Sequence, residues 1–194
     1  MNTNQISPFE YVSILVSIIL GLGITQILSS FSDLLYNHKK VKFYLPHSIW
    51  VIFVLFLHIQ DWFVTYQLKD KMIWELPELV FVLLYPIMLF MAAKMLIPTN
   101  NDEEKFDMKV FFLSQFSMIF CIIGISILLS ILFNIFFLDK GFLQQIPLMI
   151  FFLVIMFLFF KKTQHEVLHK ILAILLLISA IFSVIIEKNM WVIK

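Results

Sequence analysis

The chain has 194 residues, of which 61% are hydrophobic and 14% are charged, and its formal net charge at pH 7 is +1. A soluble domain usually carries about 25% charged residues, because most of its surface faces water. The composition therefore indicates a protein whose solvent is the lipid bilayer. All 14 basic residues are lysine, and the missing arginine together with the near-neutral charge argues against nucleic-acid binding.

Apolar segments of membrane-spanning length follow one another along the chain. A membrane-spanning helix needs roughly 17–25 mostly apolar residues. Six segments approach or meet this length, at residues 11–31, 49–66, 79–97, 110–138, 146–160 and 168–186. The last two are brief and close together, so a helical hairpin that enters the bilayer only partway is the alternative for that pair. We expect an all-α fold, a polytopic transmembrane helical bundle of six helices in a single domain over residues 1–194, with a polar acidic loop at 98–109.

The lysines are distributed unevenly over the loops between these spans. With six spans, nine lysines fall on one side of the membrane and five on the other. Cytoplasmic loops carry the excess of lysine and arginine in membrane proteins. The distribution predicts that the nine-lysine side is cytoplasmic and that both chain termini lie on the opposite side.

One side of the first predicted span carries small residues at intervals of four positions. The row consists of Ser17, Gly21, Thr25 and Ser29. A row of small residues on a helix lets another backbone approach closely, which is how helices associate in lipid. We interpret it chiefly as a helix-packing face, with a pore-lining or ligand-facing role as the alternative.

The second predicted span contains ionisable residues. His58, Asp61 and Thr65 are three and four positions apart and therefore share one face of a helix, with Gln60 nearby. Ionisable groups inside a membrane segment are costly and usually face the bundle interior or a water-filled path. We expect a functional site here, in which Asp61 pairs with His58 or meets Gln26 of the first span. The alternative is that Asp61 lies at the level of the lipid headgroups, where its cost is small.

Residues 165–169 match a catalytic metal-binding pattern, His-Glu-x-x-His. On a helix, His165 and His169 would share a face and bind zinc, with Glu166 as general base. A catalytic zinc needs a third protein ligand. The only acid downstream is Glu187, roughly 27 Å away along a continuous helix. We therefore interpret this stretch as a short polar loop between two spans and keep a zinc hydrolase as the alternative. No cofactor is expected.

Two stretches of the chain resemble known sequences. Residues 7–13 read Ser-Pro-Phe-Glu-Tyr-Val-Ser, and residues 21–26 read Gly-Leu-Gly-Ile-Thr-Gln. They look like the start of a group of small, uncharacterised bacterial inner-membrane proteins. The sequences Pro-His-Ser-Ile-Trp at 46–50 and His-Ile-Gln-Asp-Trp at 58–62 look like the second span of that group. This resemblance implies a multi-pass protein of the bacterial inner (cytoplasmic) membrane.

A second resemblance rests on size, membrane character and a composition rich in lysine, phenylalanine and isoleucine. In these respects the chain is similar to the small membrane accessory proteins of type VI-B CRISPR loci, of the kind without a ribonuclease motif. The absence of arginine excludes the Arg-plus-His ribonuclease motif of the other kind. This resemblance implies a modulator of RNA-guided anti-phage immunity that acts at the membrane.

The leading functional hypothesis is a non-enzymatic accessory or effector protein of the inner membrane. It would associate through the small-residue face, as a homo-oligomer or with an operon-encoded protein partner, and modulate anti-phage defence by membrane association or permeabilisation. A small channel or transporter that uses His58 and Asp61 is the first alternative. A zinc-dependent membrane hydrolase at residues 165–169 is the second.

Overall fold

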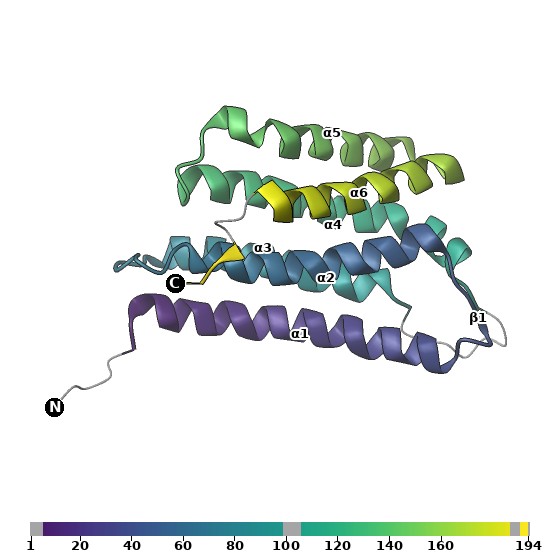
Figure 1. Ribbon diagram of the computed structural model, residues 1–194, viewed down its shortest axis with the longest axis horizontal. Helices are drawn as coiled ribbons and strands as arrows, with labels where there is room; N and C mark the ends of the chain where they lie inside the picture. Colours follow the sequence, from purple (N-terminus) through teal and green to yellow (C-terminus); the bar gives the residue numbers. More distant parts are fainter. Residues whose placement is uncertain (1–5, 99–105, 187–190, 194) are drawn as a thin grey trace.

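The computed structural model describes residues 6–98, 106–186 and 191–193, and helix dominates it (Figure 1). The long helices in this part of the chain are α1 (Pro8–Tyr36), α2 (Leu45–Tyr66), α3 (Leu76–Leu96), α4 (Met108–Phe136), α5 (Ile146–Lys161) and α6 (Glu166–Ile186). The remaining elements are short: the strands β1 (Val41–Lys42) and β2 (Phe106–Asp107) and the 3-10 helix η1 (Phe142–Gln145). The predicted all-α fold is confirmed.

The helices begin where the sequence provides capping groups. At the start of α1, the backbone N–H of Glu10 donates to the Ser7 hydroxyl at 3.1 Å, and the N–H of Ser7 donates to the Glu10 carboxylate at 2.6 Å. This capping box satisfies N–H groups that have no partner inside the helix. Proline occupies the first turn of α1, α2, α3 and α5, where the missing N–H costs no helical hydrogen bond.

The spans agree in number with the six predicted from the sequence. All six helices are long and apolar enough to cross a membrane when η1 is counted with α5. The last two segments then have 20 and 21 residues, so both reach spanning length and the shorter hairpin is not needed. Helices α1 and α4 each have 29 residues. At 1.5 Å per residue they measure about 43 Å, so they tilt or extend beyond a hydrocarbon layer of about 30 Å.

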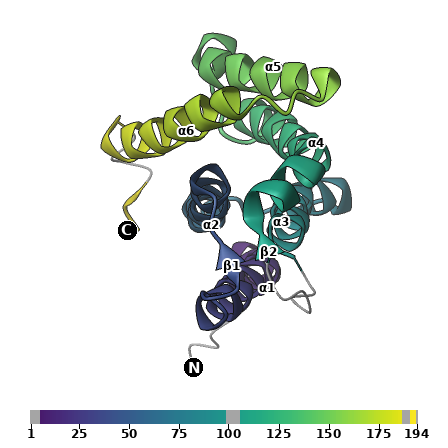
Figure 2. The same ribbon diagram turned by 90° about the vertical axis from the view of Figure 1, so that its right-hand side faces the viewer.

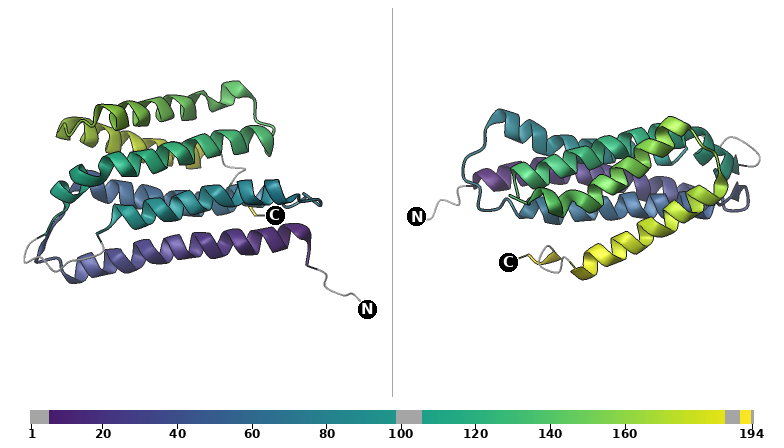
Figure 3. Two further views of the ribbon diagram at one scale, coloured as in Figure 1. Left: turned by 180° about the vertical axis from the view of Figure 1, so that it is seen from behind. Right: turned by 90° about the horizontal axis from the view of Figure 1, so that it is seen from above.

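Consecutive helices run in opposite directions, and each of the first four packs on the helix that follows it (Figures 1 and 2). Helices α1, α2 and α3 all contact one another, so the first three helices form one group. Helix α4 packs on α3, α5 packs on α4, and α6 packs on α2. Helix α6 thereby lies along one edge of the bundle (Figure 3).

The helices differ in how much of their surface the chain itself covers. In the most apolar 18-residue stretch of each span, 56% of the residues of α4 are buried, against 17% for α5 with η1 and 22% for α6. Large apolar side chains such as Phe160 and Phe182 are exposed on these two outer helices. Such a surface is unfavourable in water but not in lipid, which is as apolar as the side chains themselves.

The loops that follow α1 and α3 meet at one end of the bundle. There β1 pairs with β2 in parallel, with Val41 opposite Phe106 and Lys42 opposite Asp107. The predicted acidic loop at 98–109 is shorter than expected, because β2 occupies residues 106–107 and α4 begins at Met108. Residues 99–105 of that loop lie outside the described residues.

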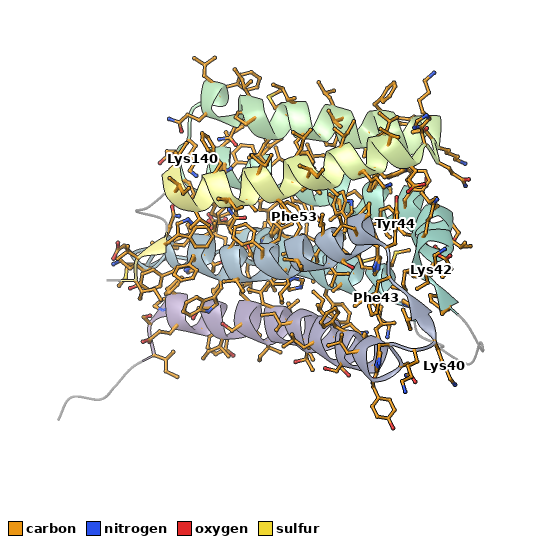
Figure 4. All side chains as sticks on the ribbon, turned by 45° about the vertical axis from the view of Figure 1, so that its right-hand side comes forward. Lys40, Lys42, Phe43, Tyr44, Phe53 and Lys140 are labelled. Carbon is orange, nitrogen blue, oxygen red and sulfur yellow. The ribbon has the colours of Figure 1, made fainter. Side chains whose placement is uncertain are left out.

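The end that carries β1 and β2 also carries most of the described lysines. Figure 4 shows Lys40 and Lys42 at this end and Lys140 at the opposite end. Lys109 at the start of α4 pairs here with Glu166 at the start of α6. The loops predicted for the nine-lysine side therefore lie together, as six alternating spans require. Which side of the membrane they face stays a prediction.

Candidate functional site

The polar face of α2 points into the group formed by the first three helices. His58, Asp61 and Thr65 are 0%, 9% and 4% exposed, respectively. Their spacing of three and four residues keeps them in register with one side of a helix, and that side is the one α2 buries. The sequence-based prediction of one shared polar face thus agrees with the packing of α2.

The hydrogen bond of His58 defines which of its ring nitrogens is an acceptor. Nδ1 lies 2.7 Å from the carbonyl oxygen of Val54, one turn earlier in α2. A carbonyl oxygen only accepts, so Nδ1 carries the hydrogen and donates it. In the neutral ring, Nε2 is then left with its lone pair as an acceptor. This Nε2 atom is buried and has no hydrogen-bond partner in the described part of the chain.

Gly23 of α1 allows the imidazole ring of His58 to lie against the α1 backbone. A Cβ atom at residue 23 would lie 2.0 Å from Nε2 and 2.6 Å from Cδ2 of His58. Both distances are far below van der Waals contact, so a side chain at this position would displace the ring. The small-residue row predicted from the sequence contains Gly21 and misses Gly23. The signal for Gly23 is its spacing from Leu20 and Ile27, which are buried on the same side of α1.

Among the described residues, Asp61 is a buried acid without a countercharge. Within this part of the chain its buried Oδ2 atom has no hydrogen-bond partner, and none of the ion pairs includes it. Tyr85 of α3 lies within electrostatic reach of the carboxyl group. Burying an unpaired carboxylate charge costs several kcal/mol. Asp61 is therefore either protonated and neutral, or ionised beside a cation that shares its site.

The two pairings predicted for Asp61 do not form among the described residues. Nε2 of His58 and Oδ2 of Asp61 are both without partners, although the two residues are one turn apart. The side-chain amide of Gln26 donates instead to the hydroxyl of Ser30, one turn later in α1, at 2.9 Å. Gln60, the fourth residue of the predicted cluster, is half-buried, next to the buried face of α2.

Most of the small-residue row of α1 is exposed on the outside of the bundle. Within the chain, α1 packs through a different side, which includes Val16, Leu20 and Gly23. Gly21, Thr25 and Ser29 are exposed, and Ser17 is half-buried. A Cβ atom at Gly21 would meet no atom within 4 Å. The row therefore takes no part in packing inside this chain, and contact with another chain stays a prediction.

A pocket with a volume of about 280 Å³ lies between α1 and α2. Its α1 wall consists of Ser17, Leu20, Gly21 and Ile24. Its α2 wall consists of His58, Ile59 and Trp62. The pocket joins two features that the sequence suggested separately, because it contains part of the small-residue row and the buried histidine.

The residues of the His-Glu-x-x-His pattern diverge in the structure. His165 is exposed, whereas His169 is buried among the rings of Phe112, Phe116 and Phe120 of α4. Nε2 of His169 lies 2.9 Å from the carbonyl oxygen of Thr163 and donates to it.

Ion pairs also occupy the carboxylate of the predicted general base. Glu166 pairs with Lys109 and with Lys170, the latter at 2.7 Å. The described residues contain no group of three His, Cys, Asp or Glu side chains that could hold a metal ion. Glu187, the acid considered as a third ligand, lies outside the described residues. The contacts of Glu166 and His169 attach the start of α6 to α4, and the geometry offers no support for zinc hydrolysis.

Comparisons of the chain with protein-family models, with curated proteins and with solved structures gave no match. The two resemblances named above stay predictions.

Proposed function

We propose that this chain is a small multi-pass membrane transport protein, a channel or transporter, that moves protons. His58 and Asp61 would form its intramembrane relay. The observation that carries the proposal is a buried base and a buried acid, one turn apart on α2. Each has an atom without a partner among the residues that the structure describes. Ionisable residues inside a spanning helix mark ion and proton pathways more often than structural positions.

The depth of the two residues supports this role. Counted back from the end of α2 at Tyr66, His58 and Asp61 lie about 12 Å and about 8 Å inside the helix at 1.5 Å per residue. The chain itself covers Asp61, which is only 9% exposed.

The chemistry of the pair suits a proton better than a larger cation. Nε2 of His58 offers a lone pair, and a neutral Asp61 offers an O–H donor. Side chains three positions apart on a helix are neighbours, so a rotation of Asp61 brings the two groups within reach. One proton can then pass between acid and imidazole while the pair as a whole keeps zero net charge. Thr65, which is also buried, continues the same face toward the end of α2.

Proton flux into liposomes tests the proposal. Purified protein is reconstituted, a potassium diffusion potential is applied, and a pH-sensitive dye inside the vesicles reports proton entry. We expect flux above that of empty liposomes, and we expect Asp61→Asn to lower it by at least about tenfold, since the amide cannot release a proton. Asp33→Asn removes an exposed carboxylate at the end of α1 and serves as the matched control. Wild-type flux equal to that of empty liposomes would overturn the proposal.

A second candidate function is the accessory or effector role in the inner membrane. The exposed small-residue row of α1, and in particular the open space at Gly21, favours it. In that role a second copy of the chain or an operon-encoded protein would pack on this row. The link to anti-phage defence rests on the compositional resemblance alone.

A further inference from the structure

The turn between α5 and α6, residues 162–165, gathers lysines at the end of the bundle that carries β1. Lys161 ends α5 and Lys162 follows it, and both side chains are exposed. Lys109 and Lys170 both pair with Glu166 at the start of α6. None of the ion pairs among the described residues includes Lys161 or Lys162. Four lysines therefore share one carboxylate, and two of them are left without a countercharge in this part of the chain.

Hydrogen bonds attach the α5–α6 turn to its neighbours. The ring of His169 donates to the carbonyl oxygen of Thr163 at 2.9 Å. The side-chain amide of Gln164 donates to the carbonyl oxygen of Leu113 in α4 at 3.5 Å. The two unpaired lysines thus project from a backbone that is already held, so a ligand that binds them has to order little more than their side chains.

Apolar surface continues from these lysines along both helices. Helix α5 packs on α4 and α6 packs on α2, so the two helices separate from their common turn (Figure 3). Phe157 and Phe160 of α5 are exposed, and so are Val167 and Ile171 of α6. In a membrane these side chains contact lipid chains. The lysines at the ends of the same helices then lie at the level of the lipid headgroups.

We infer that the α5–α6 turn binds an anionic phospholipid, with Lys161 and Lys162 at the headgroup and the acyl chains on the apolar surfaces of α5 and α6. A zwitterionic headgroup carries its own cation, which cancels the charge of the phosphate, so the lysines favour the anionic lipid. Each lysine near a membrane surface strengthens such binding about fivefold.

The apolar surface beside the lysines identifies the membrane as the source of the ligand. A soluble phosphate would contact the lysines alone, whereas a lipid contacts the lysines and the exposed side chains of α5 and α6 together. The inference is independent of the proposed proton relay, because the turn contains neither His58 nor Asp61.

Lipid titration of the purified protein, followed by native mass spectrometry, tests the inference. Dioleoyl phosphatidylglycerol is the anionic probe. Dioleoyl phosphatidylcholine, which has the same chains and no net charge, is its matched control. We expect the first phosphatidylglycerol to bind about 25-fold more tightly than the first phosphatidylcholine, as two lysines at about fivefold each require.

Two double variants establish whether this preference belongs to the α5–α6 turn. Lys161→Gln with Lys162→Gln should lose most of the preference and bind phosphatidylcholine as the wild type does. Lys39→Gln with Lys40→Gln removes two adjacent, exposed lysines from the turn after α1, at the same end of the bundle. This control has the same change in charge and should keep the wild-type preference.

Equal affinity of the wild type for the two lipids would refute the inference. An equal loss in both double variants would also refute it, because binding would then follow the total charge of this end of the bundle. Glycerol 3-phosphate, which has the phosphate without the chains, should not displace the lipid at equal concentration. Displacement would assign the two lysines to a soluble phosphate instead.

Discussion

Gly23 of α1 and His58 of α2 are in direct contact, and the contact requires that residue 23 lack a side chain. A Cβ at this position would lie 2.0 Å from Nε2 of the imidazole. The pair brings the two helices together at a histidine whose Nε2 is buried and has no partner among the described residues. The position of His58, and with it the geometry of the proposed relay, depends on a residue that carries no chemistry of its own.

Substitution of Gly23 by alanine should therefore be far more costly than substitution of Gly21. We expect Gly23→Ala to lower the free energy of unfolding by about 1–3 kcal/mol, because the methyl group forces His58 from its place. Gly21→Ala should be nearly neutral, since its Cβ meets no neighbour. Unfolding in mixed detergent micelles, followed by circular dichroism, measures both.

A double-mutant cycle tests whether this loss of stability arises from the contact with His58. With His58→Ala already present, Gly23→Ala should lose most of its effect, because the ring that it displaces is gone. Equal stability of Gly23→Ala and Gly21→Ala, or additive effects of Gly23→Ala and His58→Ala, would contradict the contact.

Because of the ion pair between Lys42 and Asp107, the stability of the fold should depend on pH in acidic solution. The hydrogen bond from Lys42 holds the pKa of Asp107 below its usual value of 3.8. Because the pKa of Asp107 is lower in the folded protein than in the unfolded chain, the pair stabilises the fold at pH values above the pKa of the unfolded chain. This contribution disappears as the pH falls through the pKa of the folded protein.

The Asp107→Asn variant tests this, since asparagine can still cap α4. We expect its Tm to be about 1–3 °C below that of the wild type at pH 6, because the pair is partly exposed and weak. The difference should shrink as the pH falls below 3.8 and vanish once it is below the lowered pKa of Asp107 in the folded protein. A constant difference across this range would mean that capping, and not charge, is what the substitution changes.

The uneven distribution of lysines predicts the orientation of the chain. With Cys121 replaced by serine, single cysteines are introduced at Lys40 and Lys140, which lie at opposite ends of the bundle (Figure 4). We expect a membrane-impermeant maleimide to label the residue 140 cysteine in intact spheroplasts and the residue 40 cysteine only in inverted vesicles. Labelling of both from the same side would contradict six alternating spans.

The exposed row on α1 makes a prediction about assembly. If another copy packs on it, Gly21→Leu and Ser29→Leu should both shift the purified protein toward the monomer, because a bulky side chain keeps the backbones apart. Val154→Leu, on the exposed side of α5, is the matched control. Mass photometry in nanodiscs measures the distribution of species, and a normal oligomer in both α1 variants would exclude this face.

Much of this architecture can be derived from the sequence, because it depends on local properties. Runs of apolar residues define six spans, since in lipid every backbone group must be satisfied within its own helix. The shared face of His58, Asp61 and Thr65 follows from helical periodicity alone. The start of α1 follows from the capping box between Ser7 and Glu10.

Apart from α2, whose ionisable residues mark its inner side, only the tertiary structure decided which face of each helix is inside. In water, apolar residues mark the buried side, but a helix in lipid is apolar on both sides, and its sequence does not distinguish core from surface. For this reason Gly21, in the regular row, is exposed, whereas Gly23 meets His58. For the same reason, His165 and His169 match a zinc motif in sequence but lie in different environments, one exposed and one enclosed by the rings of α4.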